Sequence, residues 1–71
     1  MTPETRALGT RIREQRLKRG WSQDQFADNC GIHRSRMGEI ERGEVDLTLS
    51  TMLLIARTFE STLAALFKGV A

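Results

Sequence analysis

Three polar residues, Arg34, Ser35 and Arg36, begin a short predicted helix directly after a predicted tight turn at Gly31. Arginine carries a permanent charge and five N–H donors in a planar fork, which suits phosphates and the edges of bases. The arginines lie in the more basic part of the chain, since residues 1–42 carry nine Arg and Lys against six Asp and Glu. Residues 43–71 carry two against three. The pattern indicates a helix that projects from the body of the protein to meet a polyanion.

The residues that could catalyse a reaction are too few to form a site. The chain of 71 residues has one His, one Cys, no Tyr and no glycine-rich phosphate loop, so it offers no acid–base pair and no activated nucleophile. Cys30 has no second cysteine for a disulfide, and with His33 it is too little for a metal site. We expect no enzyme activity, no metal, no cofactor and no small-molecule ligand. We expect Cys30 to be a core residue.

Neither a membrane segment nor a secretion signal is predicted. The longest apolar run, MLLIA, is too short to cross a bilayer. The first residues are charged from Glu4 onward and lack the apolar region of a signal peptide. Together with the lone cysteine, these features are typical of a cytoplasmic protein.

The whole chain is predicted to form one all-α domain of five short helices. Thr2 and Pro3 suit the start of the first helix, and Gly20 suits its end. Ser22 and Gln25 form the S-x-x-Q capping box that starts the second helix. The later helices are predicted over about residues 34–42, 49–59 and 62–67.

One stretch carries small and apolar residues at the offsets of a helix-turn-helix, which we expect over about residues 22–42. Counted from Gln23 as position one, an alanine stands at position five and a glycine at position nine. Ala27 must be small because a second helix crosses close over it, and Gly31 can adopt the positive φ that reverses the chain. Five residues are predicted to form the buried side: Phe26, Cys30, Ile32, Met37 and Ile40. The alternative is a plain helical hairpin, which does not require the alanine and the glycine.

The chain also resembles the Cro and lambda-repressor class of helix-turn-helix proteins, the XRE family, over about residues 8–67. The likeness rests on RIREQRLKRGWSQDQFADNCGI, IERGE, LTLSTMLLIA and LAALF. MGEIERGE followed by DLTL also resembles the controller proteins of restriction–modification systems. The resemblance implies a lambda-repressor-like fold, a homodimer, and double-stranded operator DNA read in the major groove.

Carried over residue by residue, the resemblance places the start of the third helix in the groove. Arginine pairs with guanine and glutamate accepts from cytosine, so the expected base contacts are Arg34, Ser35, Arg36 and Glu39. Gln23 matches the family's phosphate-binding glutamine. The other expected phosphate contacts are Ser22, His33, Arg11 and Arg42. The alternatives are a solvated basic face for the arginines, a cap for His33, and neutralisation of Arg36 or Arg42 by Glu39.

Arg16 and Glu41 match a pair that, in the family, joins the end of the first helix to the end of the third. We expect a partly buried structural ion pair that locks the third helix onto the rest of the domain. A direct contact of Arg16 with DNA is the alternative.

The sequence departs from the family at two places. The loop after the third helix reads EVD over residues 44–46, where the family carries basic residues. We therefore expect the electrostatic contacts to shift to other residues, namely Arg11, Arg13, Lys18, Arg19 and Arg42. Glu60 stands where the family often has glycine, so we expect a strained turn there.

The last two predicted helices, over about residues 49–67, hold more apolar residues than so small a domain can bury. The core face of the first of them is predicted to contain Leu49, Met52, Ile55, Ala56 and Phe59. An exposed apolar surface usually marks an interface. The expected dimer interface contains Leu53, Leu54, Leu63, Leu66, Phe67 and Val70. Pairing there would hold two recognition helices about 34 Å apart, one turn of DNA, on a pseudo-palindromic site; the alternative for Leu54 is a lone exposed leucine.

These patterns predict a sequence-specific DNA-binding transcription regulator that acts as a homodimer, with the controller of a restriction–modification system as the narrower candidate. The alternative is an antitoxin-like or phage-repressor-like protein whose main role is to bind a protein partner.

Overall fold

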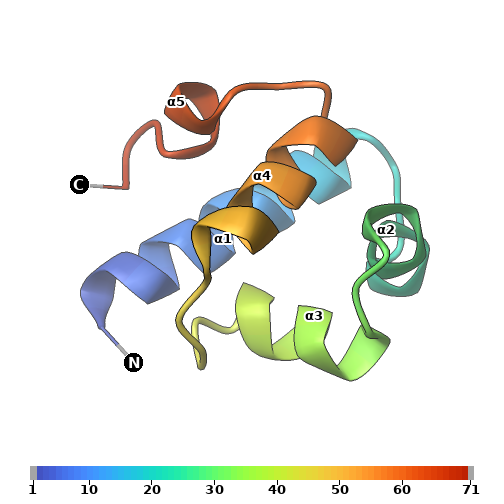
Figure 1. The fold of residues 1–71 in the computed structure, drawn as a ribbon, viewed down its shortest axis with the longest axis horizontal. Helices are drawn as coiled ribbons and strands as arrows, with labels where there is room; N and C mark the ends of the chain where they lie inside the picture. Colours follow the sequence, from blue (N-terminus) through green and yellow to red (C-terminus); the bar gives the residue numbers. More distant parts are fainter. Residues whose placement is uncertain (1, 71) are drawn as a thin grey trace.

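The computed structural model describes residues 2–70 and, over that part of the chain, contains five α-helices and no strand (Figure 1). They are α1 (Pro3–Lys18), α2 (Gln23–Cys30), α3 (Arg34–Glu41), α4 (Leu49–Thr58) and α5 (Leu63–Leu66). α3 and α5 lie on opposite sides of the long α1 (Figure 1). This confirms the predicted all-α class. Within the described residues, no helix combines the length and the apolar character needed to cross a membrane.

Each helix begins at a residue whose side chain accepts a backbone N–H from the first turn. Ser22 Oγ accepts from the Gln25 N–H at 3.0 Å, and the Gln25 side chain accepts from the Ser22 N–H at 2.8 Å. This reciprocal pair is the capping box predicted from the sequence. The N-caps of the other helices are Thr2, His33, Thr48 and Thr62. Local side-chain chemistry therefore sets where every helix starts.

The turn between α2 and α3 has the geometry expected of a helix-turn-helix. Gly31 ends α2 with φ of 73°, and the Ile32 N–H donates to the Ala27 carbonyl at 2.9 Å. Phe26, Ala27 and Met37 are completely buried. Ala27 is thus buried, as predicted, although Ile32 is only partly buried at the edge of the core.

The core is built from all five helices around a stack of aromatic rings. The Phe26 and Phe59 ring centroids lie 4.7 Å apart, and Trp21 stacks at 5.9 Å from Phe26 and 6.1 Å from Phe59. Cys30 is buried as predicted, and burial raises the pKa of its thiol, an effect partly offset by a hydrogen bond with Thr58. The thiol therefore remains protonated and acts as an apolar core group.

Two of the apolar predictions are wrong. Leu49, expected on the core face of α4, is 60% exposed, whereas Leu66, expected at a dimer interface, is only 2% exposed in the single chain. Leu49 is the first residue of α4, and side chains of a helix lean toward its N-terminus, so Leu49 has no preceding turn to pack beside. Leu66 faces inward from α5 and belongs to the core.

α1 and the end of α3 approach so closely that only glycine fits between them. A Cβ atom on Gly9 would lie 2.6 Å from the carbonyl oxygens of both Ile40 and Glu41. A Cβ atom on Gly43, where φ is 73°, would lie 2.6 Å from the Arg6 Cα. The sequence analysis missed this contact, which brings α1 to the end of α3.

The turn before α5 is strained at the predicted residue. Glu60 has φ of 53° and is, within residues 2–70, the only non-glycine residue with positive φ. Glycine adopts this conformation more easily than any residue with a Cβ.

Candidate nucleic-acid interface

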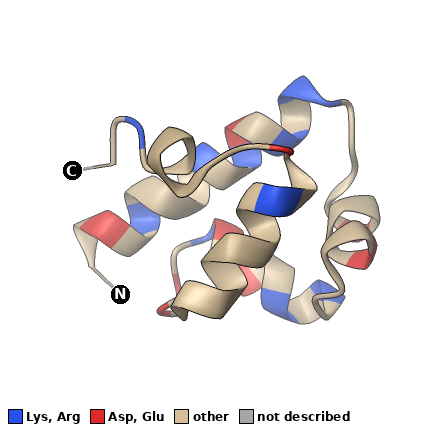
Figure 2. Cartoon of the chain, turned by 45° about the horizontal axis from the view of Figure 1, so that its top comes forward, with Lys and Arg blue, Asp and Glu red and all other residues tan. Residues whose placement is uncertain are grey.

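The first turn of α3 faces solvent, and the rest of the helix faces the core. Arg34, Ser35 and Arg36 are exposed, whereas Met37 and Ile40 are buried. Figure 2 marks basic segments at the start of α3 and acidic segments on the neighbouring α2. The projecting basic turn expected from the sequence is therefore present.

Arg34 is held by two carboxylates of α2. Its Nη2 lies 3.0 Å from Asp28 Oδ2, its Nε donates to Asp28 Oδ1 at 3.5 Å, and its Nη1 lies 3.3 Å from Asp24 Oδ2. All three side chains remain more than half exposed. The hydrogen bond and charge of Asp28, and then the charge of Asp24, raise the pKa of Arg34. The sequence analysis missed this arrangement, although the spacing of Asp24 and Asp28 by one helical turn is visible in the sequence.

Arg36 and Ser35 differ from Arg34 in their surroundings. Arg36 makes no hydrogen bond or ion pair with another residue of the described chain. Ser35 Oγ lies 2.7 Å from His33 Nδ1, and the Ser35 N–H donates to the same nitrogen at 3.2 Å. His33 is therefore the N-cap of α3, as one of the two expectations for it stated. Glu39, the remaining expected base contact, is partly buried.

Some of the residues expected to contact phosphate already form hydrogen bonds within the protein, and others are exposed. Gln23 Nε2 donates to Glu41 Oε1 at 3.2 Å. Arg42 Nε donates to Glu44 Oε2 at 3.0 Å, so Glu44, more than Glu39, neutralises this arginine. The same contact lowers the pKa of Glu44. Ser22 is exposed at the start of α2.

Two arginines expected to take part in DNA contacts instead support the fold. Arg11 Nη2 donates to the Ala65 carbonyl in α5 at 3.1 Å, on the side of α1 away from α3 (Figure 1). Arg19 donates to the Phe59 carbonyl at 2.8 Å, and its guanidinium carbon lies 4.5 Å from the centre of the Phe59 ring. We therefore leave both out of the candidate interface.

A buried ion pair fixes α3 to the end of α1. Arg16 Nε and Nη2 donate to the two oxygens of Glu41 at 2.8 and 3.0 Å, and both residues are only 8% exposed. Arg16 Nη1 also donates to the Trp21 carbonyl at 2.9 Å. Gln23 completes the network from α2 through its bond with Glu41. The predicted structural ion pair is confirmed, and it joins three helices.

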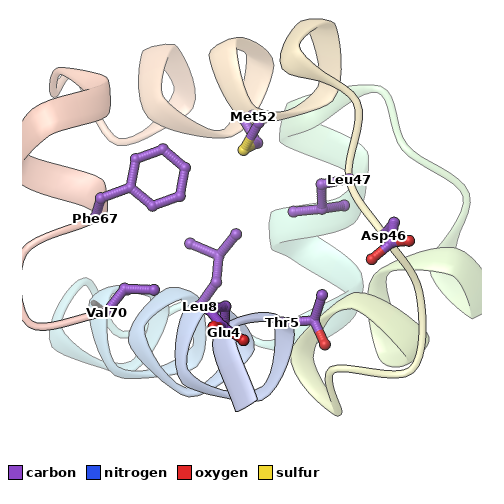
Figure 3. A pocket seen from close by; sticks show the side chains of 8 residues that line it. All are labelled: Glu4, Thr5, Leu8, Asp46, Leu47, Met52, Phe67 and Val70. Carbon is purple, nitrogen blue, oxygen red and sulfur yellow. The ribbon is translucent and has the colours of Figure 1, made fainter. Parts of the chain in front are cut away.

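The surface of α4 and of the residues after α5 is partly apolar. Leu54 is 41% exposed and Phe67 36% exposed, while Leu53, Leu63 and Val70 are partly buried. A hollow of about 320 Å³ lies next to this surface (Figure 3). Its lining residues are Glu4, Thr5, Leu8, Asp46, Leu47, Met52, Phe67 and Val70. Two residues of the expected dimer interface, Phe67 and Val70, thus share one depression with α1 and α4.

The described residues offer no metal site, since residues 2–70 contain no group of three or more His, Cys, Asp or Glu placed to hold an ion.

Comparison with known proteins identifies the family. A helix-turn-helix family model matches residues 12–66. The chain is 34% identical over 59 residues to control protein C.SmaI of Serratia marcescens, which is 83% of this chain and 70% of that protein. It is 37% identical over 51 residues to the HTH-type transcriptional regulator SutR of Escherichia coli (strain K12), 72% of this chain and 29% of SutR. The crystal structure of the restriction-modification controller protein C.AhdI from Aeromonas hydrophila is similar, with a TM-score of 0.89 and 32% identity over 93% of this chain and 100% of that one. The chain therefore belongs to the XRE-type helix-turn-helix family of DNA-binding transcription regulators.

Proposed function

We propose that this protein binds specific operator DNA with the first turn of α3 in the major groove. The observation that carries the proposal is the exposed turn with Arg34, Ser35 and Arg36, held in place by the buried Arg16–Glu41 pair. Arginine recognises guanine through two parallel N–H donors, and that contact requires a rigidly placed backbone. Exposed arginines and a backbone fixed by a buried ion pair are the two features of α3 that support the proposal.

The names of the relatives indicate which genes the protein would regulate. C.SmaI and C.AhdI are named as a control protein and a restriction-modification controller protein, and the present chain covers most or all of their lengths. This supports a role as the controller of a restriction–modification system. The operator would then lie close to genes of such a system.

We further propose that the protein acts as a homodimer through α4 and the residues around α5. Leu54 and Phe67 are large apolar side chains that the single chain leaves exposed, and Leu49 adds a third. A two-fold pairing through these residues would leave both α3 helices on one side of the dimer. Helix-turn-helix dimers read half-sites about 34 Å apart, so the operator is expected to be a pseudo-palindrome.

The test is selection of synthetic duplexes from a randomised library with the purified protein. Enrichment of one pseudo-palindromic sequence supports the proposal, and recovery of unrelated duplexes with equal affinity contradicts it. The affinity for the selected duplex should fall on the order of a thousandfold or more between about 50 and 200 mM salt, if roughly six to eight phosphates are neutralised.

Two variants separate base contacts from phosphate contacts. Arg36→Ala should weaken binding to the selected duplex on the order of 10- to 100-fold and relax the preference at one base pair. Gln23→Ala should weaken binding to all duplexes alike. The reverse pattern, with Gln23 setting a base preference, would show that α3 lies in the groove in a different register.

A further inference from the structure

Asp24 and Asp28 present their carboxylates to the start of the recognition helix, where a DNA-binding protein would be expected to avoid negative charge. We infer that these two residues position Arg34 and thereby set its preference for a base over a phosphate. The inference rests on the proposed function, because it concerns how the same surface discriminates among DNA sequences.

The geometry leaves a defined part of Arg34 available. The contacts with Asp28 and Asp24 use one N–H on each of the three guanidinium nitrogens. Of the five donors, one on Nη1 and one on Nη2 remain. A bidentate contact with guanine O6 and N7 requires two parallel N–H donors. The remaining donors form such a pair when Asp24 accepts the Nη1 hydrogen nearer to Cδ. In that arrangement the carboxylates hold Arg34 and leave the outer end of its guanidinium for guanine.

The carboxylates also come from a rigid element. Asp24 and Asp28 lie one turn apart on α2, so they share one face of that helix. The Gly31 turn and the buried side chains of Phe26 and Met37 fix α2 relative to α3. Arg36 provides the internal comparison, because it lies on the same helical turn of α3 and has no such partner among the described residues.

Two physical consequences follow from this arrangement. A guanidinium that is already held loses less side-chain entropy when it binds, and its plane is directed before contact. In addition, the two negative charges repel a phosphate that approaches Arg34, whereas the guanine edge is uncharged. The arrangement weakens non-specific binding, which depends on phosphate contacts, more than it weakens recognition of guanine.

The experiment uses the duplex selected by the wild-type protein, a second duplex changed at the base pair for which Arg34→Ala loses preference, and an unrelated duplex. The variants are Asp28→Asn and the double variant Asp24→Asn with Asp28→Asn. Glu14→Gln, an exposed residue of α1, is the matched control for the single charge removed in Asp28→Asn. Melting temperatures of all variants exclude an effect through folding.

The expected result is that the double variant binds the unrelated duplex more tightly than the wild type and discriminates at the Arg34 base pair at least about threefold less. Glu14→Gln should keep the full discrimination, and Asp28→Glu should keep more of it than Asp28→Asn. If the double variant retains full discrimination while Arg34→Ala abolishes it, the inference is wrong and the proposed function stands. If the wild type selects no sequence at all, the proposed function fails and the inference fails with it.

Discussion

Replacing Arg16 with alanine should destabilise the whole domain, because it leaves the Glu41 carboxylate buried without its partner. The Glu41 side chain is 3% exposed, so water cannot replace the two hydrogen bonds from Arg16. After the substitution, one bond from Gln23 remains. The Trp21 carbonyl also loses a donor.

The expected magnitude is a large fraction of the total stability. Breaking a buried ion pair from one side costs about 3–5 kcal/mol. A domain of this length has a free energy of unfolding of about 4–11 kcal/mol, at roughly 0.05–0.15 kcal/mol per residue. Each kcal/mol shifts the melting temperature of so small a domain by about 4–8 °C, so Arg16→Ala should lower it by about 12 °C or more.

The assay is thermal and urea unfolding followed by circular dichroism. Arg13→Ala, an exposed arginine on the same helix, should change the stability by no more than about 0.5 kcal/mol. The double variant Arg16→Met with Glu41→Leu removes both charges and should recover most of the loss. An unchanged melting temperature in Arg16→Ala, with weakened DNA binding, would refute the structural role and assign Arg16 to DNA.

Three further substitutions test other parts of the structure. Gly9→Ala should destabilise the domain by about 1–3 kcal/mol in urea unfolding, because its Cβ would overlap two backbone carbonyls. Gly38→Ala is the control, since the nearest contact of its Cβ would be the flexible end of Arg42. Equal stability of the two variants would contradict the close approach at Gly9. Leu54→Glu should leave the helical signal intact but weaken self-association in sedimentation at micromolar concentration; a monomeric wild type that binds a full palindrome as one unit would contradict the dimer. Glu60→Gly should raise the free energy of unfolding by about 1 kcal/mol, and a lower melting temperature would show that the turn is not strained.

The ends of the helices were predictable because short-range chemistry determines them. Thr2, Ser22, Thr48 and Thr62 each cap a helix within three residues of their own position, and Gly31 ends α2 by its own backbone freedom. The buried residues of the helix-turn-helix were also predictable, because their spacing within one compact motif fixes which side of each helix is covered.

Several features that the sequence analysis missed depend on contacts between segments that are distant in the chain. Gly9 lies in the middle of α1, and nothing near it in the sequence indicates that the end of α3 packs against it. Ile40, which it contacts, is 31 residues further along the chain. Helical periodicity does not show whether the Leu66 side chain faces the core or the solvent, because α5 has only four residues. Arg11 and Arg19 carry the same charge as Arg36. Only the neighbours of each residue in space show that Arg11 and Arg19 bond to the backbone of the fold, whereas Arg36 faces solvent.

The division of α3 into an exposed first turn and a buried remainder has a consequence for engineering new specificity. Ser35 and Arg36 can be exchanged for the corresponding residues of another family member without repacking the core, since neither is buried. Arg34 cannot be transplanted alone in this way. Its removal would leave Asp24 and Asp28 as two exposed carboxylates without their cationic partner. Under the proposed DNA-binding role, a graft therefore has to transfer these three residues from two helices as one unit.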